Sequence, residues 1–412
     1  MRHDLRAVVR HAERALALEP TVDDRGELLV LRAAAQGEQA DWDEAALLEA
    51  RAAALAAGRL EDAVRAGYLL AQWAEYAEAD AATCDRYLDD ALELARQVPP
   101  GPMATLPFHH RCYRLLSQGD SEGVLRMSAE EIRRAREADA PAALALMQVW
   151  HGLAAVRLGN PAGLEEIATA HATLERLAHV RAPTAAYNLA NALVAAGRLP
   201  DAREAVERAA EWARRMNLVA TERTAAAELA WYAHHAGEVD EAEALLEHAE
   251  REPTSADALA TAATVRARLH RERAPGWARA QAEAAVAYGE QVENVEQALI
   301  GRAALAGACL ADGDLRAAAD VCDAALADCS AAPPTGDVVV ELALVLAALG
   351  RPDDVRAPAA ELPPSPWRDA ALALADGRHD DAAAALAGVP SIPLRDNALE
   401  LAAEVAAHRA RP

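Results

Sequence analysis

Three acidic residues in one short segment could bind a divalent cation. Asp89, Asp90 and Glu93 form a DDxxE sequence, and carboxylate oxygens could hold Mg²⁺ against a diphosphate. The same segment has an apolar stripe at the spacing of a helix face, formed by Tyr87, Leu88, Ala91, Leu92 and Ala95. No second metal-binding sequence follows it. We therefore expect a solvated acidic helix face, and an all-α metal-dependent diphosphate enzyme is the most distant of three functional hypotheses.

The cysteines and histidines are the other candidate metal ligands. The five cysteines, at positions 84, 112, 309, 322 and 329, lack C-x-x-C spacing, and Cys322 and Cys329 continue an apolar helical stripe of the kind that small core residues form. The pairs 109–110 and 234–235 are adjacent histidines, which diverge on a helix, and the second pair precedes a helix end that favours His. No G-x-S-x-G, P-loop, H-E-x-x-H or dinucleotide fingerprint occurs. We expect no metal, no cofactor and no enzymatic activity.

The charge of the chain restricts its partners. The 412 residues carry 41 basic and 65 acidic side chains, a formal charge of −24, which disfavours nucleic acid and anionic membranes. Residues 101–200 differ, with 10 Arg against 9 acids, so this block is where a peptide of negative character would bind. The chain opens without a signal peptide, and its longest apolar run, Val338–Leu349, is interrupted by Glu341. We therefore expect a cytoplasmic protein without a membrane span.

These residues must be positioned by a repeated element, and glycines mark its period. In eight places Gly is followed five residues later by a small or apolar residue, at Gly58, Gly119, Gly159, Gly197, Gly237, Gly313, Gly350 and Gly377. Seven residues before all but the first lies another small residue, namely Cys112, Gly152, Ala190, Ala230, Ala306, Ala343 and Ala370. The pattern predicts a helix that ends at a left-handed Gly and a second helix packed closely on it. Such pairs complete their cores by stacking.

The segment Ala186–Ala210, AYNLANALVAAGRLPDAREAVERAA, resembles the tetratricopeptide repeat. The wider spacing of 37–40 residues is similar to the solenoid arms of bacterial transcription activators and actinobacterial signalling proteins. The resemblance implies an all-α, right-handed α-α superhelix of about ten helix pairs. Its expected parts are degenerate repeats over 1–97, central repeats over 103–330 and C-terminal repeats over 335–412, joined into one solenoid across Pro-rich segments. The opening AERALALEP resembles the end of a repeat, so we expect a piece of a longer protein.

The resemblance also implies a binding surface, because fixed positions of the first repeat helices line a concave groove. The candidate partner-binding residues on this basis are His109, Tyr113, Arg157, Tyr187, Asn191, Trp231 and His234. Asn191 takes the place of the Asn that bonds a ligand backbone in peptide-clamping members, whereas Tyr187 and Trp231 could equally pack between helices. A basic cluster at positions 266, 268, 271, 273 and 279 could dock an acidic partner or pair with neighbouring repeats.

Two functional hypotheses stand ahead of the enzyme. The first is a non-catalytic module that binds a protein or peptide in its concave groove and serves as the regulatory or sensing arm of a bacterial signalling system. The second is a scaffold that assembles complexes through its edges and outer face, without a ligand groove.

Overall fold

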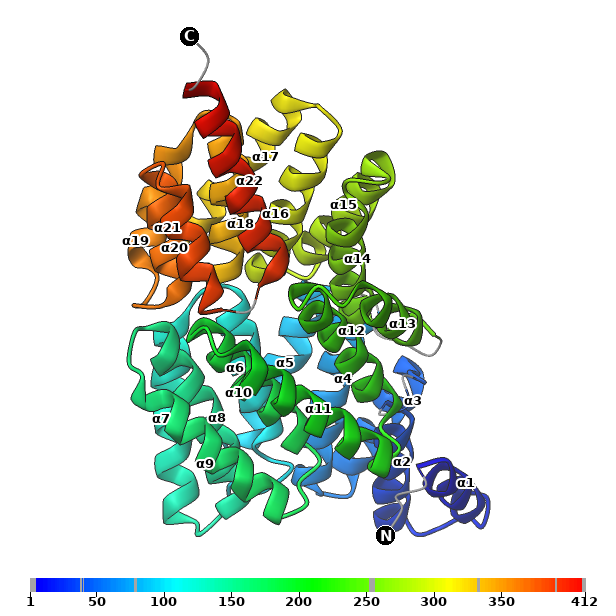
Figure 1. Cartoon of the computed structure of the whole chain (residues 1–412). Coiled ribbons are helices and arrows are strands. Elements are labelled where there is room, and N and C mark those ends of the chain that lie inside the picture. The colour runs from blue at the N-terminus through cyan, green and yellow to red at the C-terminus, as the bar shows by residue number, and fades with distance from the viewer. Residues whose placement is uncertain are drawn as a thin grey trace.

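The chain is all-α in the residues that the computed structural model describes, which are 5–37, 39, 41–77, 80–251, 256–331, 334–389 and 391–409 (Figure 1). The first half contains helices α1 (Leu5–Leu16), α2 (Val22–Gly37), α3 (Glu44–Ala56), α4 (Leu60–Tyr76), α5 (Ala81–Ala95), α6 (Leu106–Ser117), α7 (Ser121–Glu137), α8 (Pro141–Arg157), α9 (Ala162–Arg176), α10 (Ala182–Ala195) and α11 (Leu199–Met216). The second half contains α12 (Val219–His235), α13 (Val239–Ala249), α14 (Ala256–His270), α15 (Pro275–Gln291), α16 (Val295–Ala311), α17 (Leu315–Ala331), α18 (Gly336–Ala348), the 3-10 helix η1 (Pro352–Val355), α19 (Arg356–Glu361), α20 (Pro366–Ala375), α21 (His379–Ala387) and α22 (Ile392–Arg409). No helix among the described residues is long and apolar enough to cross a bilayer.

Consecutive helices pack in pairs, from α2 with α3 to α20 with α21, and α1 and α22 flank the array. This arrangement gives ten pairs within the described residues, so the expected right-handed α-solenoid of about ten helix pairs is confirmed. Even-numbered helices from α4 to α16 form the inner layer, and their odd-numbered partners lie outside them. Two of the three Pro-rich segments of the sequence, Val98–Pro102 and Pro363–Pro366, separate helices, after α5 and after α19. The third, 331–335, includes residues 332 and 333, which lie outside the described residues.

The glycine period is confirmed in backbone geometry. The eight predicted glycines are the eight that have positive φ among the described residues, with values from 68° to 85°. Seven of these turns lie between the first and the second helix of a pair, whereas Gly58 lies between α3, the second helix of its pair, and α4, the first helix of the next. The N-terminal turn is therefore out of phase with the rest. This shift explains why Arg51, rather than a small residue, precedes Gly58 by seven positions.

The small positions lie where helices of a pair approach most closely. A Cβ atom added to Gly152 would lie 2.6 Å from the Gly163 carbonyl oxygen and 2.7 Å from Ile167 Cγ1. The small residues ahead of the other inner-helix turns are also buried. The side chains at these crossings must therefore stay small because the backbones leave no volume for more atoms.

Enlarging one such residue is expected to destabilise the fold. Ala202 is fully buried, so Ala202→Leu should lower the free energy of unfolding by ~1–3 kcal/mol through overpacking. Arg208 lies on the same helix and makes only an exposed ion pair with Glu204, so Arg208→Leu should change it by less than about 1 kcal/mol. Urea titrations of the two variants measure the difference, and equal losses would contradict the assigned packing.

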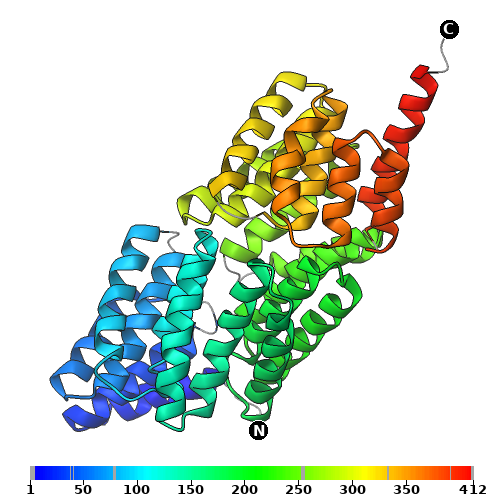
Figure 2. The ribbon, with the colours of Figure 1, turned by 90° about the vertical axis from the view of Figure 1, so that its left-hand side faces the viewer.

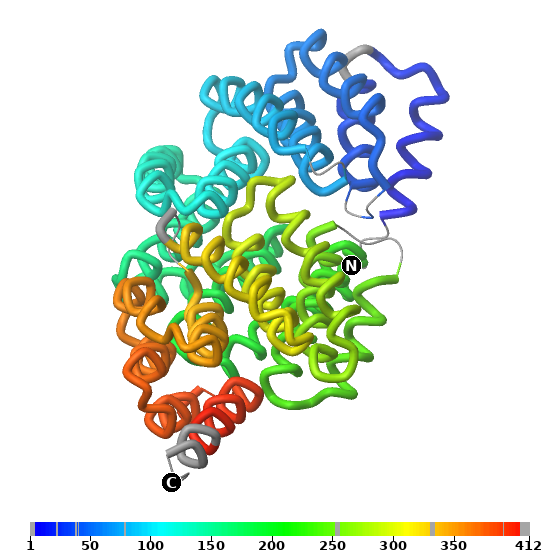
Figure 3. Tube along the Cα trace, turned by 90° about the horizontal axis from the view of Figure 1, so that it is seen from above, coloured from blue at the N-terminus to red at the C-terminus, as the bar shows by residue number. Residues whose placement is uncertain are grey.

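The superhelix curls until distant repeats meet. Seen from above, the α16 region lies over the first half of the array, close to α6 (Figure 3), and the side view shows the C-terminal pairs above α10–α12 (Figure 2). The Trp367 indole N–H donates to the Val194 carbonyl over 2.7 Å, and His235 Nδ1 lies 2.7 Å from Ser391 Oγ. These contacts close the concave side of the array into an interior space.

A buried arginine lies where α6 meets the loop before α16. Arg114 on α6 is 1% exposed, and its guanidinium lies 3.4 Å from a Glu75 carboxylate oxygen and 3.1 Å from one of Asp85. The same guanidinium donates to the Val292 carbonyl over 2.5 Å, 178 residues away in sequence. One cation therefore joins α4, α5 and α6 to the loop before α16.

Candidate functional site

The closed concave side contains a cavity of about 370 Å³. Its walls come mainly from the inner helices α4, α6, α8, α10, α12, α14 and α16. Five of the seven tyrosines and three of the seven tryptophans of this aromatic-poor chain line it, namely Tyr68, Tyr76, Tyr113, Tyr187, Tyr232, Trp42, Trp150 and Trp231. This size and this mixture of rings with a few polar groups are typical of ligand sites.

Five of the seven predicted partner-binding residues lie together on the cavity wall, namely His109, Tyr113, Tyr187, Asn191 and Trp231. Arg157 lies in an adjoining smaller cavity, where its guanidinium is 2.7 Å from a Glu296 carboxylate oxygen. His234 lies apart from both, beside Arg268 and Glu341. The inner-helix register thus brings together the predicted residues of α6, α10 and α12, whereas Arg157 of α8 and His234 at the end of α12 lie outside this cavity.

Several of the predicted residues already have internal partners. His109 Nδ1 accepts a 2.7 Å hydrogen bond from the Trp150 indole N–H, and burial lowers the His109 pKa well below its usual value. The Tyr187 hydroxyl donates to the Thr221 carbonyl over 3.0 Å. These bonds fix the orientation of the rings, so Tyr187 offers a ligand its face rather than its hydroxyl. Asn191 is exposed and makes no hydrogen bond among the described residues.

Two acids of the cavity were missed by sequence reasoning. Glu228 on α12 and Asp257 on α14 both line it. Burial, and then the neighbouring charge of Asp257, raises the Glu228 pKa to about 7. Burial, and then Glu75, raises the Asp257 pKa to about 6. The sequence analysis proposed no groove residue on α14, and no spacing rule places acids of α12 and α14 in one cavity.

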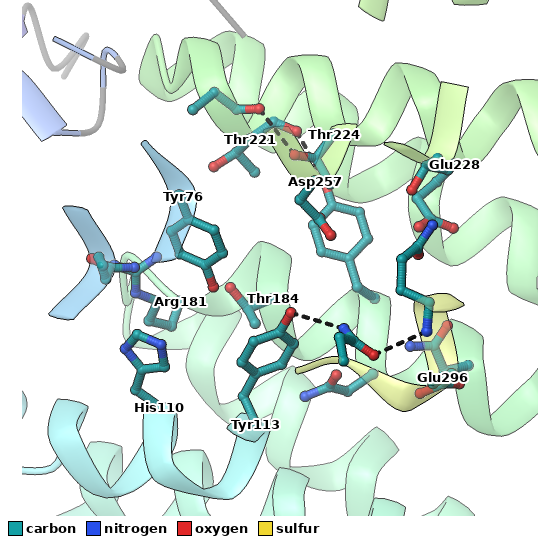
Figure 4. A pocket seen from close by; sticks show the side chains of 18 of the residues that line it. Tyr76, His110, Tyr113, Arg181, Thr184, Thr221, Thr224, Glu228, Asp257 and Glu296 are labelled. Atoms are coloured by element: carbon teal, nitrogen blue, oxygen red, sulfur yellow. Dashed lines mark hydrogen bonds between the residues drawn. The ribbon is translucent and has the colours of Figure 1, made fainter. Parts of the chain in front are cut away.

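The cavity is electrically asymmetric. In the view of Figure 4, Arg181 lies at one end beside Tyr76 and His110, Glu228 lies at the other, and Asp257 lies between them. The Arg181 guanidinium stacks over the Tyr68 ring, 5.6 Å from its centroid, and donates to Gln72 over 3.4 Å. The acidic end therefore has no comparable cation among the cavity-lining residues.

Two buried amides at the cavity lack acceptors. Asn188 is 6% exposed and Gln297 is 9% exposed, and the side-chain nitrogen of each has no hydrogen-bond partner within the described part of the chain. Both residues line the cavity. Because a buried donor without an acceptor costs free energy, such groups indicate an acceptor supplied by water or a ligand.

One cluster beside the cavity has the composition of a metal site. The ligand atoms of Glu75, Cys84 and His110 lie within 4.8 Å of one another, and all three residues are buried. However, Glu75 already accepts from His110 over 2.5 Å and from Arg114 over 3.4 Å. Burial also raises the Cys84 pKa, which keeps the thiol protonated. A guanidinium within the cluster supplies the positive charge that a metal would otherwise provide, so the group is a buried ion-pair network.

The other sequence candidates lie in ordinary structural surroundings. Asp89 and Asp90 of the DDxxE pair with Arg111 and Arg51 respectively. Cys309, Cys322 and Cys329 are buried free thiols in the C-terminal core. Within the described residues, neither group forms a set of three or more ligand atoms close enough to hold one metal ion.

The basic cluster at 266–279 is largely paired with neighbouring repeats. Arg266 binds Glu243 and Glu250, and both Arg268 and Arg271 bind Glu341. Arg279 binds Glu283 and Asp314. These ion pairs favour the structural alternative over a docking surface for an acidic partner.

The helix-end explanation for the histidine pair 234–235 is not the main effect. Burial lowers the pKa of both side chains, that of His234 to about 3. Both imidazoles are therefore neutral at pH 7, and a charge interaction with the helix dipole does not arise. His235 instead bonds Ser391 and packs on Trp231, with ring centroids 4.1 Å apart.

The sequence matches no family model and no curated protein. Among solved structures, a Rap protein complexed with Competence and Sporulation Factor is similar over 73% of this chain and 98% of its own, with 11% identity and a TM-score of 0.49. A signal transduction ATPase with a tetratricopeptide repeat sensor from Pyrococcus horikoshii is similar over 90% of this chain and 55% of its own, with 12% identity and a TM-score of 0.46. Yeast Tom70 is similar over 91% of this chain and 85% of its own, with 13% identity and a TM-score of 0.40.

Proposed function

We propose that this chain is a non-catalytic solenoid that binds a peptide, or a segment of a protein, in its central cavity, and that it serves as a regulatory or sensing arm of a bacterial signalling system. The observation that carries the proposal is the concentration of aromatic residues around one cavity of about 370 Å³. Rigid aromatic anchors with a few polar groups dominate binding energy where they are desolvated.

The closed superhelix suits this role because a ligand in the cavity would contact repeats that are distant in sequence. The cavity walls come from repeats that are distant in sequence, and they meet through few contacts, such as the bond of 3.4 Å from the Asn294 amide to the Tyr113 hydroxyl. A ligand that contacts both α6 and α16 would favour the closed arrangement over an open one. Such a difference in affinity between two arrangements is what a sensor needs.

Panning a phage-displayed library of random peptides against the immobilised chain, and titrating the enriched peptides, tests the proposal. Trp231→Ala should weaken their binding by ~2 kcal/mol or more, because it removes an aromatic anchor. Asn191→Ala should weaken it less. Trp212→Ala is the matched control, since Trp212 is also partly buried but lies on outer helix α11, and Asp380→Ala is a distant surface control. If panning enriches no peptide, or if Trp231→Ala and Asn191→Ala both bind the peptides as tightly as the parent does, the scaffold hypothesis is favoured instead.

A further inference from the structure

The acids that line the cavity divide into two kinds. Glu296 is paired with Arg157 at 2.7 Å. Burial raises the pKa of Asp337, but the charge of Arg268 and a hydrogen bond with Thr335 partly offset this effect. Glu228 and Asp257 differ, because within the described residues neither makes an ion pair or a side-chain hydrogen bond. Two half-buried carboxylates without a cation are unusual, since buried charges are normally paired.

The two carboxylates act on each other and on one shared ring. The charge of Asp257 raises the Glu228 pKa, and the charges of both acids raise the pKa of Tyr187. All three side chains are therefore within electrostatic range in one part of the cavity. Because like charges in a desolvated site repel, a cation between them would relieve the repulsion and stabilise both ionised forms.

The walls around these acids are also suited to a cation. Tyr187, Trp231 and Tyr232 line this cavity, and Trp231 and Tyr232 are edge-to-face with centroids 4.9 Å apart. The faces of such rings attract ammonium and guanidinium groups. The cavity also needs hydrogen-bond acceptors, because the side-chain amide nitrogens of Asn188 and Gln297 have no acceptor within the described residues.

We propose that the cavity recognises the ammonium or guanidinium group of a basic peptide side chain, held between Glu228 and Asp257 against the aromatic rings, while carbonyls of the same peptide accept hydrogen bonds from Asn188 and Gln297. This inference rests on the proposed peptide-binding function and specifies its ligand. It differs from the expectation of a peptide of negative character, which came from residues 101–200 alone, because both acids lie outside that block.

The test uses the full chain and the peptides enriched by panning. These peptides should be rich in Lys or Arg, and replacing one such residue by norleucine or citrulline should weaken binding at least tenfold. The double variant Glu228→Gln, Asp257→Asn should lose affinity for the basic peptide by a similar factor and bind the neutral peptide as well as the parent does. Glu165→Gln, an exposed carboxylate on α9, is the matched control. Arginine methyl ester, as a free cation, should compete for the parent only at far higher concentration than the peptide.

The outcomes separate the inference from the function on which it rests. Enriched peptides without basic residues, or basic peptides that bind the double variant as well as the parent, would overturn the cation site while leaving peptide binding intact. A library that yields no binder would overturn the proposed function and the inference with it. Competition by arginine methyl ester at the concentration of the peptide would assign the site to a small amine rather than a peptide. Because the norleucine and citrulline substitutions are made in the peptide and not in the protein, a folding defect of the protein cannot cause the loss of binding that they produce.

Discussion

Replacing Arg114 by Met is expected to destabilise the chain by ~3–5 kcal/mol, because removal of one partner strands a buried charge. Arg114 is 1% exposed, and Glu75, its partner, is 2% exposed. The substitution also removes the donor to the Val292 carbonyl, which joins α6 to the loop before α16. A shift of the urea midpoint, followed by circular dichroism, measures the loss.

Arg111→Met provides the control for this expectation. Arg111 lies on the same helix and also binds Asp85, at 2.9 Å, but its partner Asp89 is exposed to solvent. Because the acids that lose this partner, Asp85 and Asp89, are 32% and 72% exposed and can be solvated, this variant should lose no more than about 1 kcal/mol. Similar midpoints for the two variants would show that the Arg114 network does not hold the superhelix closed.

Replacing Glu228 by Gln is expected to stabilise the ligand-free chain, by an amount that depends on pH. The folded-state pKa of Glu228 is about 7, above its ordinary value of 4.5. A carboxyl whose folded pKa is raised contributes stability at low pH, and this contribution is lost as pH rises through about 7. Roughly 1–3 kcal/mol is therefore lost in the parent between pH 4.5 and pH 8, after allowance for the partial exposure of the group. The variant avoids this loss.

The difference between parent and variant isolates the effect from other titrations. The charged or titratable groups that act on Glu228, or on which it acts, are Asp257, Glu296, Tyr187 and Tyr232. The variant should match the parent at pH 4.5 in urea unfolding and exceed it at pH 8. A constant difference across this range would mean that Glu228 does not titrate with a raised pKa. A stabilising variant that weakens binding is typical of a functional site.

The local fold could be predicted from the sequence because its determinants are local. The eight glycines identify the left-handed turns, since Gly adopts positive φ without a Cβ penalty, and Gly152 and Ala202 identify the tight crossings. The sequence did not predict the phase shift at Gly58, because a left-handed glycine turn has the same sequence pattern within a helix pair as between two pairs.

The site could be predicted only in part, because it depends on curvature summed over many repeats. His109, Tyr113 and Tyr187 follow from the inner-helix register of neighbouring repeats. The pairing of Arg157 with Glu296 and the partnership of Glu228 with Asp257 depend on how far the superhelix curls. Small differences in angle at each pair accumulate, and no residue spacing encodes their sum.

The location of the bound peptide tests the central claim most directly. A basic peptide enriched by panning can carry a benzophenone beside its Lys or Arg residue, and after irradiation the cross-linked residues can be identified by mass spectrometry. We expect cross-links on inner helices, at cavity-lining residues of α10, α12 and α14, and their loss when the unlabelled peptide is present in excess. Cross-links confined to outer helices such as α9, α11 and α15 would contradict a binding site inside the closed superhelix.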